Sequence, residues 1–456
     1  MTGRYKAYPK MASASEVIIE NHPEHWILTR VKFNSIVKAR VGWHGLKSDD
    51  FTEVGPYLVT GSDFKGKFIQ WEHCYHCDEE RYDQDENIQL KNGDLLLTKD
   101  GTIGKVALVS GLDGKATLNS GVFVVRPITD EYTTQFYYWL LLSRAFTDFV
   151  DYYKTGSTIA HLYQDTFVNF KFPLPPLVEQ QKIANFLDHE TAKIDTLITK
   201  QERLIELLKE KRQAVISHAV TKGLNPQAPM KDSGVEWLGE VPEHWVVSKL
   251  GLYAHKIGSG KTPKGGADVY QESGVLFLRS QNVYDDGLRI SGSEATYISD
   301  LIHSEMANTS VKPFDVLLNI TGGSIGRTCI VPATFCEANV NQHVCILRFA
   351  KRNAPYFANV MKSSAIKEQI EVVQVGGNRE GLNFEQIANM KVCIPPKDEM
   401  NQINKFIQSQ LCKFDELVRK ADNAIALMKE RKTALISAAV TGKIDVRNWQ
   451  PQGVQG

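Results

Sequence analysis

Two stretches of the chain carry apolar residues at intervals of three, four or seven, with charged residues between them. In the first stretch these positions are Ile183, Leu187, Ile194, Ile198, Ile205, Leu208, Val215 and Ala219. In the second they are Ile403, Ile407, Phe414, Val418, Ile425, Met428, Leu435 and Ala439. This spacing predicts two long amphipathic helices with a coiled-coil-like apolar stripe. A helix from about Val178 to Val220 would be roughly 64 Å long at 1.5 Å per residue.

The two stretches are copies of each other. They align without a gap at an offset of 220 residues, and about 20 of the 49 positions from Pro173 to Thr221 are identical in the second copy. Such self-similarity indicates an internal duplication. A helix of this length cannot bury its stripe alone, so we expect the two copies to pair, and the long connection between them permits an antiparallel arrangement. Two independent helices, each packed on its own domain, remain the alternative.

The duplication continues upstream of each helix. The motif Pro-Glu-His-Trp occurs at 23–26 and again at 242–245, and GDLLLTKDGTIGK from Gly93 corresponds to FDVLLNITGGSIGR from Phe314. Residues 15–171 and 233–391 have the short, turn-bounded apolar runs of mixed α/β segments, with strands at 94–97, 105–109 and 121–125 and a core helix at 135–153. The segments share this skeleton and differ almost everywhere else. A shared scaffold with a divergent surface predicts two sites of one type with different targets.

Composition limits the function classes. A chain of 456 residues is too long for one domain, and 42% hydrophobic residues support real cores. The 53 basic and 53 acidic residues cancel, which argues against a purely electrostatic nucleic-acid binder but leaves local basic patches possible. No apolar run is long enough to span a membrane, and the first residues are too polar for a signal peptide. Seven cysteines, irregularly spaced, predict free thiols in a reducing cytoplasm.

Motifs for catalysis and metal binding are incomplete. Gly258 to Thr262 reads like the end of a nucleotide-binding P-loop, but His255 stands where the pattern needs glycine. We therefore expect a basic loop that touches phosphate. The run His73-Cys74-Tyr75-His76-Cys77 lacks a second ligand pair, which favours a loop with free thiols over zinc. No nucleophile elbow, zincin motif, amino-methyltransferase tetrapeptide or glycine-rich cofactor loop occurs. We expect no catalytic, cofactor-binding or metal-binding residues in this chain.

Several longer runs resemble the specificity subunit of type I restriction–modification enzymes. They are TGSTIAHLYQDTFVNFKFPLPPLVEQQKIANFLDHETAKID from Thr155, the helix ends LLKEKRQAVISHAVTKG and LMKERKTALISAAVTGK, and SGVEWLGEVPEHW from Ser233. The resemblance covers nearly the whole chain, and it departs from the family's pattern at Ser13 to Ile18. It implies an α+β fold in which two mixed α/β target-recognition domains are joined by two long antiparallel coiled-coil helices, with internal pseudo-two-fold duplication.

The resemblance also implies a division of the chain. Residues 1–172 would form the first recognition domain, 173–230 the first spacer helix and linker, 231–392 the second domain, 393–446 the second spacer helix and 447–456 a flexible tail. Each domain would read one half of a bipartite double-stranded DNA site. The helices would set the spacer and dock two methyltransferase subunits, and two translocase–nuclease subunits would join them. S-adenosylmethionine, ATP and Mg²⁺ would belong to those partners. Half-sites one helical turn apart are about 34 Å apart, which a helix of this length can span.

Residue type and position in loops predict the DNA contacts. Base edges are read by Arg, Lys, Asn, Gln, Ser or Thr, and phosphates favour Lys and Arg. The first-half candidates are Trp43, His44, Lys47, Thr60, Ser62, Lys65, Lys67, Lys99 and Thr102. The second-half candidates are Lys256, Ser259, Lys261, Thr262, Lys264, Arg279, Gln281, Asn282 and Tyr284. The acidic run from Asp78 to Glu86 should face away from phosphate.

Two other function classes stay open at this point. One is an enzyme such as a nucleotide hydrolase that uses Lys261, for which ATP turnover lost in Lys261→Ala would be the sign. The other is a coiled-coil scaffold without DNA function, in which Arg279→Ala would change nothing.

Overall fold

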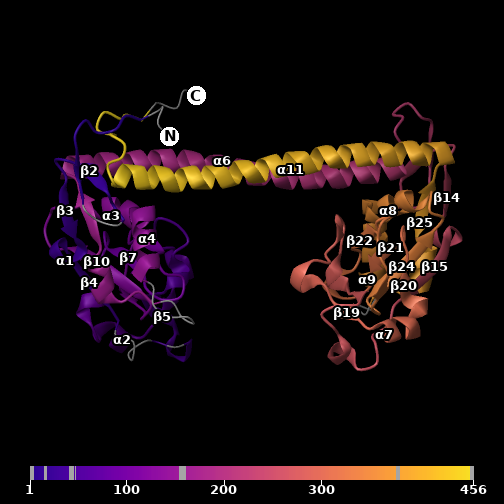
Figure 1. The fold of residues 1–456 in the computed structure, drawn as a ribbon, viewed down its shortest axis with the longest axis horizontal. Coiled ribbons are helices and arrows are strands. Elements are labelled where there is room, and N and C mark those ends of the chain that lie inside the picture. Colours follow the sequence, from indigo (N-terminus) through magenta and orange to yellow (C-terminus); the bar gives the residue numbers. More distant parts are fainter. Residues whose placement is uncertain are drawn as a thin grey trace. The chain divides into compact units, whose positions relative to one another are not determined.

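The computed structural model describes residues 5–14, 18–40, 46, 48–153, 161–375 and 381–451. The chain divides into two compact units, one of residues 1–201 with 423–456 and the other of residues 202–422. Each unit contains one globular domain and a part of both long helices (Figure 1). The five segments expected from the sequence are continuous stretches of chain, whereas the boundaries of the two units fall inside the long helices. The segment boundaries therefore remain a prediction.

In the first unit, a four-stranded sheet and a three-stranded sheet lie beneath the long helices. The sheet orders are β4-β10-β7-β8 and β6-β5-β9, and β5 and β9 are parallel. The strands are β1 Met11–Ser13, β2 Asn21–Pro23, β3 Ile27–Arg30, β4 Ser35–Ala39, β5 Thr52–Val59, β6 Tyr75–His76, β7 Leu95–Thr98, β8 Val106–Leu108, β9 Ala116–Leu118, β10 Val122–Pro127 and β11 Lys171–Leu174. The helices are α1 Val31–Asn34, α2 Glu79–Asp83, α3 Thr134–Leu141, α4 Arg144–Tyr153 and α5 Gln164–Phe167.

The second unit repeats this plan. Its sheet orders are β15-β24-β21-β22 and β19-β16-β23-β20, and β16 and β23 are parallel. The strands are β12 Met230–Asp232, β13 Glu240–Pro242, β14 Val246–Lys249, β15 Ala254–Ser259, β16 Val275–Leu278, β17 Val283–Tyr284, β18 Gly287–Leu288, β19 Tyr297–Ile298, β20 Ser310–Val311, β21 Val316–Asn319, β22 Thr328–Ile330, β23 Ala338–Val340, β24 Val344–Phe349 and β25 Lys391–Ile394. The helices are α7 Asp300–Glu305, α8 Ala354–Lys362, α9 Ser364–Val375 and α10 Phe384–Asn389.

The long helices are α6 Leu177–Thr221 and α11 Lys397–Val440. The first extends the helix predicted from Val178 to Val220 by one residue at each end. In the first unit, Lys432 of α11 pairs with Asp195 of α6 at 2.7 Å. In the second unit, Arg212 of α6 pairs with Asp415 of α11. These two ion pairs occupy equivalent positions in the duplication, as expected if the helices pair in an antiparallel manner in both units.

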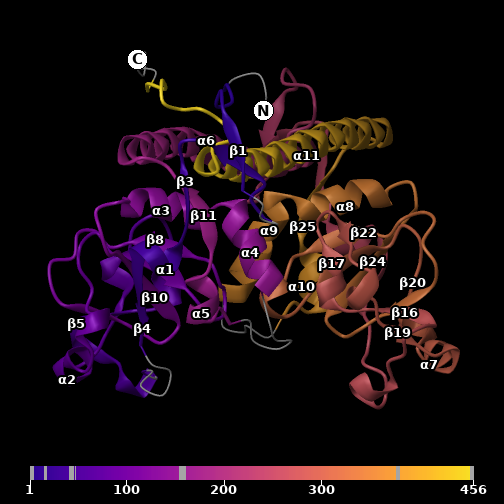
Figure 2. The same ribbon diagram turned by 60° about the vertical axis from the view of Figure 1, so that its left-hand side comes forward.

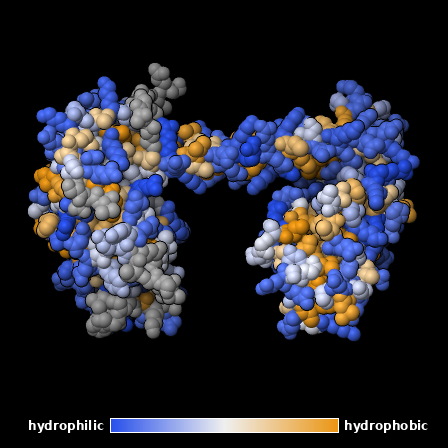
Figure 3. Space-filling model, viewed as in Figure 1, coloured by the Kyte–Doolittle hydropathy of each residue, from blue (hydrophilic) through white to orange (hydrophobic). Residues whose placement is uncertain are grey.

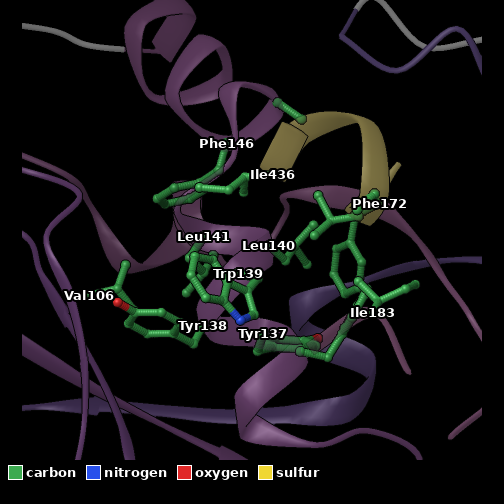
Figure 4. Close-up of a cluster of buried hydrophobic side chains, with 14 of the residues drawn as sticks. Val106, Tyr137, Tyr138, Trp139, Leu140, Leu141, Phe146, Phe172, Ile183 and Ile436 are labelled. Atoms are coloured by element: carbon green, nitrogen blue, oxygen red, sulfur yellow. The ribbon is translucent and has the colours of Figure 1, made fainter. Parts of the chain in front are cut away.

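Both helices also pack on the globular domains. Ile183 and Phe186 of α6 and Ile436 of α11 belong to the core of the first unit, together with the aromatic helix α3. Figures 1 and 2 show α3 directly beneath the long helices, and Figure 4 shows Ile436 beside Phe146 of α4. Burial of the stripe therefore involves the partner helix and the domain at once, so pairing and packing on a domain are not alternatives.

Two local details differ from the sequence expectations. The predicted helix at 135–153 is two helices, α3 and α4, because the hydroxyl of Ser143 donates to the carbonyl of Leu140 at 2.6 Å and ends the first. The tail was expected to be flexible from Arg447 onward. Trp449 instead packs edge-on against Phe186 at 5.4 Å between ring centroids, so apolar burial holds this part of the tail. Among the described residues, no helix has the length and apolar character needed to cross a bilayer.

Candidate nucleic-acid interface

The same loop junction occurs in both units. It consists of the residues that follow an interior strand of the sheet, β7 or β21, and the residues that precede the neighbouring strand, β10 or β24. Three backbone hydrogen bonds hold it in the first unit: Lys99 N to Gly121 O at 2.9 Å, Leu162 N to Lys99 O at 2.9 Å and Asn119 N to Val59 O at 3.0 Å. Their equivalents in the second unit are Ile320 N to His343 O at 3.0 Å, Leu382 N to Ile320 O at 2.8 Å and Asn341 N to Leu278 O at 3.0 Å. We call this structure the loop junction.

The side chains at the loop junction differ between the units. In the first unit, Asp100 bonds to Nδ1 of His161 through one carboxylate oxygen and pairs with Lys99 through the other at 3.4 Å. The His161 ring also lies edge-on to Tyr163, with 4.5 Å between ring centroids. The carboxylate is thus held in place while about a third of its side chain stays exposed.

In the second unit, four polar side chains form a hydrogen-bonded series. The hydroxyl of Thr262 donates to Oε1 of Gln342, and Nε2 of Gln342 lies 3.1 Å from Nε2 of His343. Nδ1 of His343 bonds to the hydroxyl of Thr321. If the Gln342 amide donates to Nε2, the imidazole proton sits on Nδ1 and is donated to Thr321. Gln342 itself is exposed.

A glycine brings the first member of this series to the others. A Cβ atom at Gly260 would lie 1.6 Å from the carbonyl oxygen of Val340, so only glycine permits the end of β15 to cross the β23–β24 connection. The close crossing places Thr262 beside Gln342, although 80 residues separate them in sequence. The glycine of this loop therefore serves a strand crossing.

The predicted first-half residues have varied surroundings. Trp43, His44 and Lys47 lie outside the described residues. Lys65, Ser62 and Thr102 are exposed, and Thr60 caps the short 3-10 helix that follows it by bonding to Asp63. Lys67 is turned to α6, where Asp188 holds its ammonium at 2.5 and 2.7 Å. Lys99 lies over the Phe123 ring, 5.7 Å from the ring centroid.

The second-half residues also divide into exposed and engaged groups. Lys261, Thr262, Lys264 and Gln281 are exposed, and Ser259 is half-buried. Burial lowers the pKa of Lys256, whose ammonium donates to the Asn308 carbonyl. Arg279 donates to the Thr296 hydroxyl at 2.7 Å. The guanidinium groups of Arg289 and Arg327 lie 4.9 and 4.8 Å from the centroid of the Tyr284 ring. Figure 3 shows hydrophilic residues over much of the visible face of each unit.

Asn282 does not fit its predicted role. It is 2% exposed, its Oδ1 accepts from the backbone of Arg279, and its Nδ2 donates to the carbonyls of Arg289 and Glu294. Its amide is used to hold the loop, so this side chain does not present a base-reading group to solvent. The other residues remain predicted contacts.

Sequence reasoning missed Asp100, His161, Thr321, Gln342 and His343. One signal was available: Gln342 and His343 directly follow Asn341, which matches Asn119, and their counterparts Ser120 and Gly121 are different in kind. Divergent polar residues beside a shared scaffold residue mark a position where function differs between copies.

Each unit also has a cavity where its domain meets the long helices. A cavity of about 800 Å³ in the first unit is lined by Lys67, Asp188, Asp195 and Lys432 among others. A cavity of about 390 Å³ in the second is lined by Arg212, Arg327 and Lys362 among others. In the first cavity the opposite charges are already paired, Lys67 with Asp188 and Lys432 with Asp195.

The cysteines give no evidence of a metal site. Cys74 and Cys77 lie in separate buried clusters, and burial raises their thiol pKa to about 12 and about 11. Within the described ranges, no group of three or more His, Cys, Asp or Glu side chains could hold an ion.

The duplicated plan matches a known family. The model of the type I restriction modification DNA specificity domain matches residues 39–207 and again 242–427. The chain belongs to this family and contains its domain twice.

Its relatives are consistent with this assignment. The chain is 24% identical to a putative type I restriction enzyme MjaX specificity subunit of Methanocaldococcus jannaschii, over 78% of this chain and 79% of that protein. It is 25% identical to the type I restriction enzyme EcoBI specificity subunit of Escherichia coli, over 76% and 75%. A solved chain from a study of type I R-M complex assembly has a TM-score of 0.69 at 16% identity, covering 93% of this chain and 99% of that one. The HsdS subunit of Thermoanaerobacter tengcongensis gives 0.51 at 16% identity, covering 93% and 98%. These likenesses support the fold.

Proposed function

We propose that this chain is the DNA-recognition subunit of a type I restriction–modification complex and that each unit reads one half of a bipartite site. The observation that carries the proposal is the loop junction. Its backbone hydrogen bonds are the same in both units, whereas its polar side chains, which are partly or fully exposed, are a carboxylate–imidazole pair in one and an amide-centred series in the other. Sequence is read by side chains that reach base edges, so one scaffold with two sets of side chains is suited to two different targets.

The long helices have a separate role in this proposal. They set the number of unread base pairs between the half-sites and dock two methyltransferase subunits, which two translocase–nuclease subunits join. Methylation and cleavage belong to those partners, together with S-adenosylmethionine, ATP and Mg²⁺. The chain itself contributes specificity and no catalysis. Its family membership and the names of its relatives, which are specificity subunits, support this assignment.

Mapping adenine methylation across the host genome, with and without this gene, tests the proposal. We expect one bipartite motif to lose its methylation when the gene is deleted and to regain it when the gene is restored. A methylation pattern that does not change, combined with no DNA binding by the chain in complex with its cognate methyltransferase subunit, would contradict the proposal.

A further inference from the structure

The loop junction combines rigidity with exposure. Its backbone is fixed by hydrogen bonds that recur in both units, and its side chains are fixed by one another. A side chain that reads a base must be held in one orientation before DNA arrives, because ordering it on binding lowers the affinity. Gln342 is held at both ends of its amide, yet it remains exposed.

The hydrogen bonds of Gln342 leave one acceptor and one donor of its amide unused. Its Oε1 accepts one hydrogen bond from Thr262, so one lone pair of this oxygen stays available. Its Nε2 uses one N–H toward His343, so the second N–H stays available. Bidentate recognition of adenine needs one acceptor for the N6 amino group and one donor for N7. The amide of Gln342 retains that pair. Lys261 and Lys264 lie on the same loop as Thr262 and are exposed, which supplies positive charge for the neighbouring phosphates.

The loop junction of the first unit presents a different chemistry, from its segment after β7. Asp100 is an acceptor held by His161 and Lys99, and each carboxylate oxygen keeps a further lone pair. Carboxylates in the major groove accept from the N4 amino group of cytosine. Lys99 offsets the charge of Asp100, which reduces its repulsion of phosphate.

We infer that the loop junction is the base-reading position of each unit, with Gln342 reading adenine in one half-site and Asp100 reading cytosine in the other. This inference rests on the proposed function and assigns residues to it. The two side chains belong to the same loop junction but to different segments of it. Asp100 follows β7, at the position of Thr321, and Gln342 precedes β24, at the position of Ser120. Each half-site thus owes part of its sequence to one residue of its own loop junction.

Selection from a pool of randomised DNA duplexes tests the inference, using the full-length chain in complex with its cognate methyltransferase subunits. Gln342→Ala should reduce the preference at one A·T pair of one half-site by roughly tenfold to a hundredfold and leave the other positions unchanged. Gln342→Glu keeps the acceptor and loses the N7 donor, so the same pair should be affected. Asp100→Asn should change one C·G pair of the other half-site.

A matched control separates base reading from general charge. Lys351 is exposed in the turn after β24, and Lys351→Ala should leave every position of the selected sequence unchanged. A wild-type complex that enriches no sequence would overturn the proposed function and this inference together. An enriched bipartite sequence that Gln342→Ala does not alter, or alters equally at all positions, would overturn the inference alone.

Discussion

Single residues determine how the polar side chains of the loop junction meet. Gly260 lets the end of β15 approach Val340, and the side chain of Asn341 accepts from the backbone of His343 at 3.1 Å. Gly260 has no side chain that could read a base, and the amide oxygen of Asn341 is used by the backbone. Both hold the backbone so that Thr262, Gln342 and His343 form one series. The scaffold residues are shared or small, and the side chains that they position are free to diverge.

Substitution of Gly260 should therefore destabilise the second unit. In Gly260→Ala the new Cβ meets backbone that cannot move aside easily, so we expect a loss of about 1–3 kcal/mol. The midpoint of guanidinium unfolding measures this loss. Gly323→Ala is the control, since nothing lies within 4 Å of its Cβ, and it should change the stability by less than about 0.5 kcal/mol. Equal midpoints for the two variants would contradict the proposed crossing.

The buried thiols of the second unit should make its stability fall at alkaline pH. Burial raises the pKa of Cys329, Cys345 and Cys393 from 9.0 to about 12. Between these values the folded state binds more protons than the unfolded state, so the stabilisation is complete below pH 9.0 and is lost as the pH rises toward about 12. Each thiol contributes a slope of up to about 1.4 kcal/mol per pH unit.

Unfolding midpoints measured as the pH rises through this range should fall. Cys345→Ala should make the fall less steep, whereas Cys412→Ala should not, because Cys412 is exposed. A profile that is the same for the wild type and Cys345→Ala would show that this thiol is not protected by burial.

At the scale of elements, each long helix begins at the same anchor. In the second unit the indole of Trp245, which is fully buried, donates to Oε2 of Glu399 at 3.0 Å, and His244 bonds to the same oxygen at 2.8 Å. Trp26, His25 and Glu179 repeat this arrangement in the first unit. The Pro-Glu-His-Trp motif therefore ties the first turn of the helix to the start of its domain.

Removal of the anchor carboxylate should be costly. Glu399→Ala leaves the buried indole N–H of Trp245 without its acceptor, and we expect a loss of about 1–3 kcal/mol. Chemical denaturation of the full chain measures it. Glu416→Ala, on the exposed face of the same helix, should leave the unfolding midpoint almost unchanged. A Glu399→Ala midpoint no lower than that of the control would exclude a stabilising anchor.

The sequence predicted the elements better than the contacts between loops. The apolar period and the Pro pairs located α6 within one residue at each end, because a helix is determined by neighbours in the chain. The hydrogen bond between Thr262 and Gln342 depends on the crossing of two segments that are far apart in sequence. A local sequence pattern cannot predict such a crossing. Asn282 was selected by residue type, but its capping of a loop buries it, and burial of a polar residue is visible only in the fold.

At the scale of the whole molecule, each globular domain contacts the end of the long helix that belongs to the other copy of the duplication. The backbone N–H of Arg144 donates to the Ser437 hydroxyl of α11, and the N–H of Ser364 donates to the Ser217 hydroxyl of α6, both at 2.8 Å. The two contacts are equivalent in the duplication. Each globular domain is thus held by the start of its own helix and by the end of the other.

Exchange of one globular domain tests the independence of the two readers. Replacement of residues 233–391 by the corresponding segment of another family member, with both long helices kept, should change one half-site of the methylated sequence. The other half-site and the spacer should remain as in the wild type. Methylome sequencing of a host that carries the chimera measures all three, and a chimera that alters both half-sites would contradict the two-reader proposal.

The discontinuity of the first unit has a consequence for synthesis on the ribosome. Its core needs Leu435, Ile436 and Ala439, and the backbone N–H of Asp445 donates to the carbonyl of Lys6 at 2.7 Å. The unit made first therefore stays incomplete until residues 435–445 have emerged, whereas residues 202–422 can close earlier. During translation the N-terminal domain exposes apolar surface that Leu435, Ile436 and Ala439 cover later, so its dependence on chaperones should end once these residues have left the ribosome.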